Sequence, residues 1–121
     1  MADIKYEFSD LMSTDQSKSI KVIKLEGQMD ESNVDDLAPK VYEVIEGAPA
    51  GTSFIIDLEL LSYMNSKSIG YMSDWYGKIT GKGGKMSIAK AATNIKDVLN
   101  VVGLDQVIPL AQTMEEAKTL V

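Results

Sequence analysis

The chain has 121 residues, a net charge of −6 at pH 7 and twelve lysines, with no arginine, histidine or cysteine. Without histidine it lacks the usual general base, the partner of a serine nucleophile and the commonest metal ligand. Without arginine it lacks the planar fork that binds phosphates and base edges, and its negative charge repels nucleic acid and anionic lipid. The composition therefore disfavours a hydrolase, a metalloenzyme and a direct nucleic-acid-binding protein, and it favours a binding or signalling module.

The length, with an apolar share of 45% and a charged share of 25%, indicates one soluble globular domain over residues 1–121. No apolar run approaches the ~18 residues of a membrane-spanning helix. The first residues lack the apolar core of a signal peptide, and the absence of cysteine rules out disulfides. We therefore expect a cytoplasmic domain that does not contact membrane.

The first two predicted elements are strands. Apolar and polar residues alternate over 4–8 and again over 20–25, which is typical of half-exposed strands. The second strand is expected to end at Gly27. The polar stretch 9–19 between them is typical of a surface loop, so the two strands are expected to form an antiparallel hairpin.

A turn over residues 29–33 then leads into the first predicted helix. Ser32 with Asp35 three residues later resembles a capping box. Pro39 is expected to kink this helix, because proline lacks a backbone donor and crowds the preceding turn. The glycines and proline of 47–51 end it. The predicted apolar face comprises Val34, Leu37, Val41, Val44 and Ile45.

The most informative stretch joins a buried strand, predicted over 53–58, to the central helix. Asn65 is a good N-cap, because its side-chain oxygen can accept a hydrogen bond from the free N–H of Lys67 or Ser68. Ser66 would then lie at the surface in the first turn, where unpaired N–H groups and the helix dipole favour negative charge. A phosphate on Ser66 would be tolerated there, although serine is also common at helix starts for capping alone. The helix itself is predicted from Ile69, Met72, Trp75, Tyr76 and Ile79 at helical spacing.

Several aromatic residues lie near Ser66 in the sequence. At helical spacing such residues belong more often to a core than to a ligand cage. Some of them could nevertheless be exposed for contact with a partner, because aromatic side chains are enriched at interfaces. These residues are Tyr63, Tyr71, Trp75 and Tyr76.

The glycine-rich stretch 80–85 is predicted to be a tight turn that ends the central helix. It lacks the spacing of a phosphate-binding P-loop, and it follows a helix where a P-loop follows a strand. A short strand is predicted directly after it, over 86–89.

The remaining elements are a helix, an edge strand and a final helix. The first of these helices is expected to be capped by Thr93 or Asn94 and to end at Gly103. Its predicted buried residues are Ile95, Val98, Leu99 and Val102. A strand over 107–110 contains a proline, which suggests an edge position. Thr113 is expected to cap the final helix.

From residue 20 onward, strands and helices alternate. This order predicts an α/β fold with a mostly parallel sheet of about five strands, about four helices and an N-terminal antiparallel strand.

The chain resembles the STAS domain of the anti-sigma factor antagonist family from about residue 20 to residue 120. Each matching stretch is short, but all of them occur in order with matching spacing. The resemblance implies a single domain in which (βα) units wind as a superhelix. The matching stretches are 25–30, 54–58, 61–66, 83–88 and 101–104.

The resemblance also implies a function without catalytic activity or cofactor. Its partner would be an anti-sigma factor, commonly also a serine-protein kinase, that binds the unphosphorylated protein and so releases a sigma factor. The kinase phosphorylates the serine at the helix start, and a separate phosphatase restores it. On matching positions, Ser66 is the phosphoacceptor and Asp30 lies on the same recognition surface. The expected partner-binding residues are Asp30, Asn65, Ser66, Lys67, Ser68 and Ile69.

The motif departs from the family pattern Asp-Ser-Ser/Thr-Gly. Asn65 keeps the capping function but loses a charge, Lys67 adds a cation beside the acceptor, and Ser68 is a second candidate acceptor. An alternative is therefore a divergent STAS module that acts as a scaffold, or as a sensor of a small anion or nucleotide, without phosphorylation. The protein is expected to be a monomer or a weak dimer.

Overall fold

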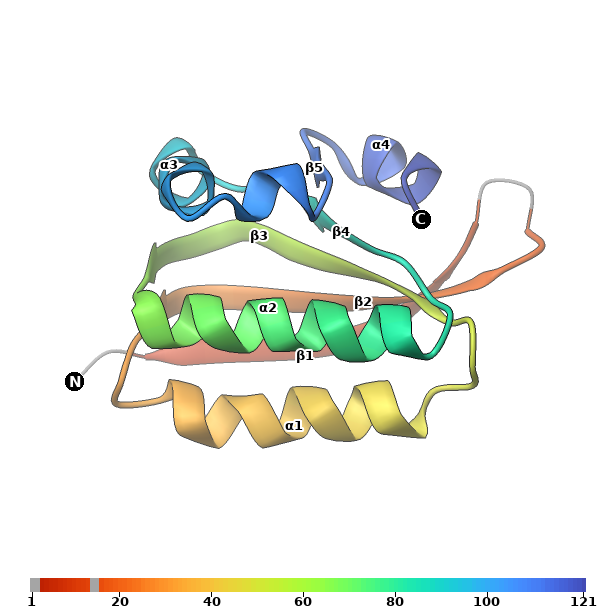
Figure 1. The fold of residues 1–121 in the computed structure, drawn as a ribbon, viewed down its shortest axis with the longest axis horizontal. Coiled ribbons are helices and arrows are strands. Elements are labelled where there is room, and N and C mark those ends of the chain that lie inside the picture. Colours follow the sequence, from red (N-terminus) through yellow and green to blue (C-terminus); the bar gives the residue numbers. More distant parts are fainter. Residues whose placement is uncertain (1–2, 14–15) are drawn as a thin grey trace.

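The computed structural model describes residues 3–13 and 16–121, which fold around one five-stranded sheet with the strand order β1-β2-β3-β4-β5 (Figure 1). β1 runs antiparallel to β2, and the other neighbouring strands are parallel. The strands are β1 (Ile4–Met12), β2 (Ser19–Met29), β3 (Ser53–Met64), β4 (Met86–Ala89) and β5 (Leu110–Ala111). The helices are α1 (Val34–Gly47), α2 (Ser66–Gly81), α3 (Thr93–Val101) and α4 (Met114–Thr119). The predicted α/β fold with an N-terminal antiparallel strand is confirmed.

Side chains alternate between the two faces of the sheet. Ile56 and Ile88 point to the face that carries α1, α2 and α3, where they belong to the larger core with the buried Trp75. Ile55 and Ala89 point to the opposite face. There α4 packs on the second core cluster through the buried Ala117, and the Ser87 hydroxyl donates a 3.1 Å hydrogen bond to the carbonyl of Ala117.

The strands β1, β2 and β3 are all longer than the predicted ones. β1 reaches Met12 within the predicted loop 9–19, of which residues 14–15 lie outside the described residues. β3 continues to Met64, and its last residues still pair with β2. The register between β2 and β3 shifts twice along this part. Residues 53–58 are all buried, whereas residues 59–64 are partly exposed. The continuous apolar run that predicts the strand therefore ends at residue 58.

The expected start of the first helix is wrong. α1 begins at Val34 after Asn33, and no side chain caps it. Pro39 lies inside α1, which runs as one helix through it. The proline removes a single hydrogen bond, the one to the carbonyl of Asp35, and its own side chain is exposed. Burial of the apolar face against the sheet outweighs that loss.

The C-terminal third combines confirmed and wrong predictions. Gly103 adopts a left-handed conformation after α3, and Thr113 caps α4 by accepting from the N–H of Glu116, both as expected. The expected cap of α3 is wrong, because its N-cap is Ala92 and no side chain caps it. The last strand is only Leu110–Ala111, since a short 3-10 helix, Leu104–Gln106, takes up the chain before it. Among the described residues, no helix combines the length and hydropathy that a membrane crossing requires.

Candidate functional site

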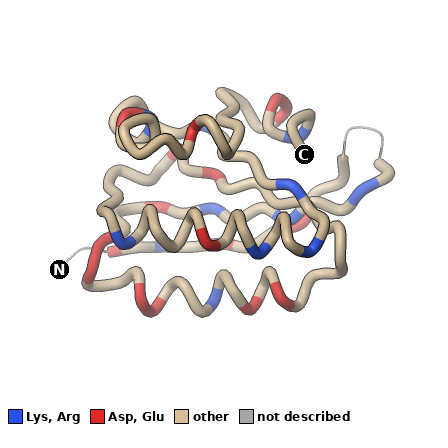
Figure 2. Tube along the Cα trace, viewed as in Figure 1, with Lys and Arg blue, Asp and Glu red and all other residues tan. Residues whose placement is uncertain are grey.

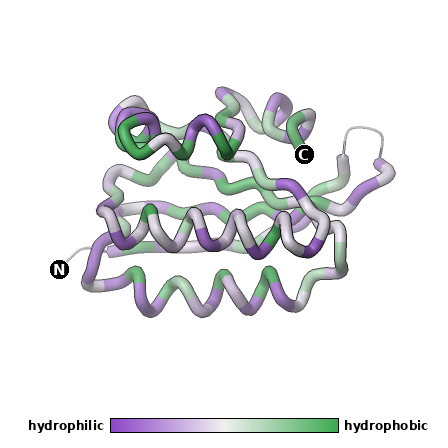
Figure 3. Tube along the Cα trace, in the orientation of Figure 1, coloured by the Kyte–Doolittle hydropathy of each residue, from purple (hydrophilic) through white to green (hydrophobic). Residues whose placement is uncertain are grey.

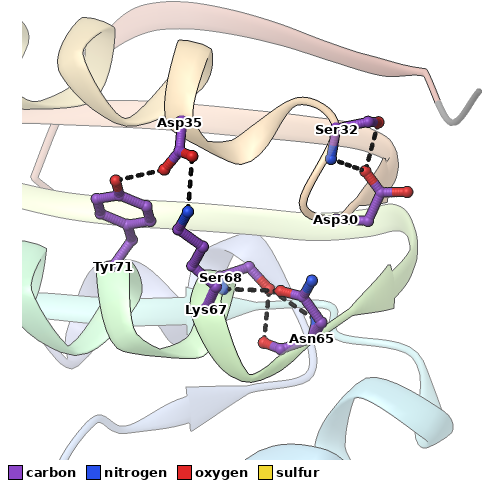
Figure 4. Close-up of polar contacts among 7 residues, drawn as sticks. All are labelled: Asp30, Ser32, Asp35, Asn65, Lys67, Ser68 and Tyr71. Atoms are coloured by element: carbon purple, nitrogen blue, oxygen red, sulfur yellow. Dashed lines mark hydrogen bonds and ion pairs between the residues drawn. The ribbon is translucent and has the colours of Figure 1, made fainter.

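The predicted site residues come together because two parallel strands end side by side. Met29, the last residue of β2, pairs with Met64, the last residue of β3. The next residues, Asp30 and Asn65, therefore leave the sheet at the same edge, where the carboxyl ends of parallel strands commonly form sites. Figure 4 shows the two turns and the helix starts that follow them.

The start of α2 is held by a reciprocal capping box. The Asn65 side-chain oxygen accepts a 2.9 Å hydrogen bond from the N–H of Ser68, as the sequence predicts for this residue. The Ser68 hydroxyl accepts from the N–H of Asn65 and donates to the Asn65 carbonyl, both at 2.8 Å. These bonds fix the first turn of α2 and the direction in which it leaves the sheet (Figure 4).

Ser66 and Ser68 differ sharply in exposure. Ser66 is the first residue of α2 and is exposed, whereas Ser68 is 0% exposed. The hydroxyl of Ser68 is already used in the capping box, and a phosphate there would break both of its hydrogen bonds. The structure therefore argues against Ser68 as a second acceptor and leaves Ser66 as the accessible hydroxyl of the motif.

Lys67 is directed away from the sheet edge, towards α1 (Figure 4). Its Nζ lies 2.6 Å from Oδ2 of Asp35, while the hydroxyl of Tyr71 donates a 2.7 Å hydrogen bond to Oδ1 of the same carboxylate. The hydrogen bond from Lys67, followed by that from Tyr71, lowers the pKa of Asp35, and the same contact raises the pKa of Lys67. Figure 2 shows charged residues of both signs along the neighbouring helices α1 and α2, with acidic residues predominating in α1.

Sequence reasoning missed the role of Asp35, which it assigned to a capping box. The contact joins residues 32 positions apart, so no local pattern signals it. It arises because α1 and α2 lie side by side on the same face of the sheet (Figure 1).

Asp30 is fixed by its own turn. Its Oδ1 accepts hydrogen bonds from the N–H of Ser32 at 2.8 Å and from the Ser32 hydroxyl at 2.6 Å. The hydroxyl bond, followed by the backbone bond, lowers the pKa of Asp30. The Asn33 side chain closes the turn by accepting from the N–H of Asp30 and donating to the carbonyl of Gln28. Asp30 thus presents a fixed negative charge beside the start of α2.

An apolar groove of about 420 Å³ lies beside Ser66, between the start of α2 and α3. It exists because β4 ends opposite Asp57, so the last part of β3 has α3 as its neighbour on that side and no strand. Asn94 of α3 donates a 2.9 Å hydrogen bond to the carbonyl of Ser62 there. The lining residues are Tyr63, Met64, Asn65, Ser66, Ile69, Asp97, Val98, Val101 and Val102.

The groove exposes side chains that the sequence assigned to the core or left open. Val101 is 83% exposed, Val102 is 52% exposed and Tyr63 is 46% exposed. The prediction that Val102 is buried is therefore wrong, whereas Trp75 is fully buried. Figure 3 shows the strongly hydrophobic turn of α3 at this side of the molecule. Neighbouring exposed apolar side chains often mark a protein interaction site.

Metal ligation is not supported by the side chains of this region. Within residues 3–13 and 16–121, no group of three or more carboxylates lies close enough together to hold a metal ion. The arrangement instead offers a hydroxyl, a fixed carboxylate and an apolar groove at one surface.

Replacing Asn65 by alanine should lower the free energy of unfolding by about 1 kcal/mol, because the N–H of Ser68 loses its acceptor at the start of α2. Asn65→Asp is the matched control. It keeps the accepting oxygen and adds a negative charge at the helix N-terminus, so it should be at least as stable as the wild type. Urea denaturation followed by circular dichroism measures both. Equal loss of stability in the two variants would contradict the capping role.

The STAS domain family model matches residues 12–117 of the chain. The anti-sigma F factor antagonist of Paenibacillus polymyxa is 22% identical over 102 residues, which cover 84% of this chain and 86% of that protein. The crystal structure of an anti-sigma factor antagonist from Mycobacterium paratuberculosis has a TM-score of 0.81 at 20% identity, covering 97% of this chain and 92% of that chain.

The anti-sigma factor antagonist SpoIIAA is similar in two states. Its unphosphorylated form has a TM-score of 0.70 at 25% identity, covering 92% of each chain. SpoIIAA of Bacillus in its phosphorylated form has a TM-score of 0.64 at 25% identity, covering 92% of this chain and 96% of that chain. The chain therefore belongs to the STAS domain family, and its fold is that of the family's anti-sigma factor antagonists.

Proposed function

We propose that this protein is an anti-sigma factor antagonist that docks on its anti-sigma factor when unmodified and is released by phosphorylation of Ser66. The observation that carries the proposal is the exposed Ser66 at the head of α2, on a surface that also carries a fixed carboxylate and an apolar groove. The names of the similar proteins from Paenibacillus polymyxa and Mycobacterium paratuberculosis support the class of partner.

The docking surface consists of Asp30, the start of α2 and the groove beside it. The exposed Val101 and Val102 at the end of α3, together with Tyr63, supply apolar area, which is the part of an interface that contributes most to affinity when it is buried. Asp30 supplies a charge that is already ordered, so little entropy is lost on fixing it at the interface. Ser66 lines the groove and follows Asn65, which leaves the sheet next to Asp30, so a partner that engages both parts would cover it.

Phosphorylation changes the docking surface more than it changes the fold. A kinase would transfer the terminal phosphoryl group of a nucleoside triphosphate to Oγ of Ser66, which loses its proton, and the nucleoside diphosphate leaves. The product carries roughly two negative charges. Within the domain, the unpaired N–H groups and the dipole of α2 favour that charge. In the complex, the phosphate would be desolvated against the partner or would face like charge, so binding is lost while the fold stays intact.

The existence of SpoIIAA structures in both phosphorylated and unphosphorylated forms supports this switch, since the same fold accommodates both states in that protein. A separate phosphatase would hydrolyse the phosphoserine and return this protein to its docking form.

The test is phosphorylation by the host's own anti-sigma factor kinase with ATP, read by intact mass and peptide mapping. The wild type should gain one phosphate, on Ser66, and Ser66→Ala should gain none. Ser73→Ala is the matched control, because Ser73 is also exposed on α2 but lies two turns further along. Modification of Ser66→Ala to the same extent as the wild type would contradict the assignment.

A further inference from the structure

We propose that Lys67 changes partner when Ser66 is phosphorylated: Asp35 holds its ammonium group in the unmodified protein, and the phosphate takes it in the modified one. This inference rests on the proposed phosphorylation of Ser66 and adds a regulatory step at the same site. Its consequence is that phosphorylation alters the surface of α1 as well as that of α2.

In the unmodified protein, Lys67 is committed to α1. Its Nζ lies 2.6 Å from Oδ2 of Asp35, and Tyr71 occupies the other carboxylate oxygen at 2.7 Å. The ion pair is nonetheless open to exchange, because the side chains of Lys67 and Asp35 are 46% and 52% exposed. Exposed pairs between mobile side chains contribute little to stability, so a stronger anion can displace the carboxylate.

A phosphate on Ser66 is such an anion. It carries about two charges where Asp35 carries one, and it offers three acceptor oxygens. Lys67 is the next residue in the chain, and its flexible four-carbon stem lets the ammonium group move without a change in the backbone. Adjacent side chains on a helix do not face each other. A phosphate, however, extends beyond Oγ at the very start of the helix, where no preceding turn blocks it.

The exchange would spread the charge change over two helices. Asp35 loses the cation that neutralises it and keeps its hydrogen bond from Tyr71. Glu31, in the turn before α1, also interacts electrostatically with Lys67. The negative charge at the start of α1 would then no longer be neutralised by Lys67 beside the docking surface. The ion pair between Lys67 of α2 and Asp35 of α1 would be broken.

The test uses protein with phosphoserine encoded at position 66, so no kinase is needed. Phosphorus NMR measures the affinity of the phosphate for its second proton in four proteins: the wild type, Lys67→Gln, Asp35→Asn and the double variant. If Asp35 competes for Lys67, Asp35→Asn frees the lysine and lowers that proton affinity about twofold or more. In the Lys67→Gln background the same change should have a much smaller effect, because there is no lysine to free.

A purely electrostatic effect of removing one carboxylate would be the same in both backgrounds, and additive shifts of this kind would overturn the proposal. Absence of any shift in the four proteins would overturn it as well. Asp36→Asn is the matched control, because it removes the neighbouring exposed carboxylate of α1. Its effect should be small and independent of Lys67. Failure of the kinase to modify Ser66 would contradict the proposed function. The NMR measurement could still be made and interpreted, because it uses encoded phosphoserine and no kinase.

Discussion

Replacing Ser66 by aspartate should weaken binding of the protein to the proposed anti-sigma factor partner about thirtyfold or more, without loss of fold stability. The substitution places a permanent negative charge at the centre of the docking surface, where the complex must desolvate it or set it against like charge. Such contacts cost about 2 kcal/mol or more, which corresponds to about thirtyfold in affinity. In the free protein the same charge lies at the N-terminus of α2, where the helix dipole favours it.

The added charge should weaken binding to the partner but should not destabilise the free protein. Measuring affinity and stability together therefore distinguishes a loss of docking from a loss of fold. Isothermal titration with the anti-sigma factor measures affinity, and thermal unfolding measures stability. Ser66→Ala should bind within about twofold of the wild type. Ser73→Asp places the same charge on an exposed position of the same helix, two turns from Ser66, and should also bind normally. Tight binding by Ser66→Asp, equal to that of Ser66→Ala, would show that charge at this position does not control docking.

Replacing Gly84 by alanine should lower the free energy of unfolding by about 3 kcal/mol. A Cβ at this position would lie 2.0 Å from the carbonyl oxygen of Thr52 and 3.0 Å from its carbonyl carbon. Both atoms belong to the backbone, so a rotamer change cannot relieve the contact. The segment before β3 is also tied to the turn by the N–H of Gly51, which bonds to the carbonyl of Lys82 at 2.8 Å. Overpacking of this kind costs about 1–3 kcal/mol, and a backbone neighbour puts Gly84 at the upper end.

Gly77→Ala is the matched control for that change. Gly77 lies exposed in the middle of α2, and a Cβ there meets nothing within 4 Å. Alanine should raise the free energy of unfolding by about 0.5–1 kcal/mol, because it favours helix and restricts the unfolded chain. Urea denaturation of the two variants should therefore move the midpoint in opposite directions. If Gly84→Ala left the free energy of unfolding unchanged, the segment before β3 would be able to move away from the added methyl group.

Local sequence rules were sufficient to predict the start of α2 at Asn65 and Ser66. Asn65 is recognisable as an N-cap because the hydrogen bond it accepts comes from a residue three positions on, within one helical turn. The exposure of Ser66 follows from its place in that turn. The order of strands and helices likewise predicted the mostly parallel sheet, because crossover connections between parallel strands have few alternatives.

The same local rules failed where a choice depended on distant residues. Ser32 and Asp35 have the spacing of a capping box, yet Asp30 takes the Ser32 hydroxyl and Asp35 binds Lys67 and Tyr71 of another helix. Asn94 could have capped α3, but its side chain donates to the carbonyl of Ser62 in β3. For Asp35 and Asn94, the packing of the elements selected a distant partner over a local one. Ser32 instead bonds within its own turn, because Asp30 lies only two residues before it.

By itself, then, the sequence determined the α/β order, the cap of α2 and the position of the exposed serine, since each depends on neighbours within a turn or on strand and helix periodicity. Only the tertiary structure decided that Ser68 is buried, that Asp35 holds Lys67, and that a groove opens beside Ser66. These features depend on how far each strand extends and on which helices lie side by side. Register and helix placement are set by contacts between residues more than thirty positions apart, which no local pattern records.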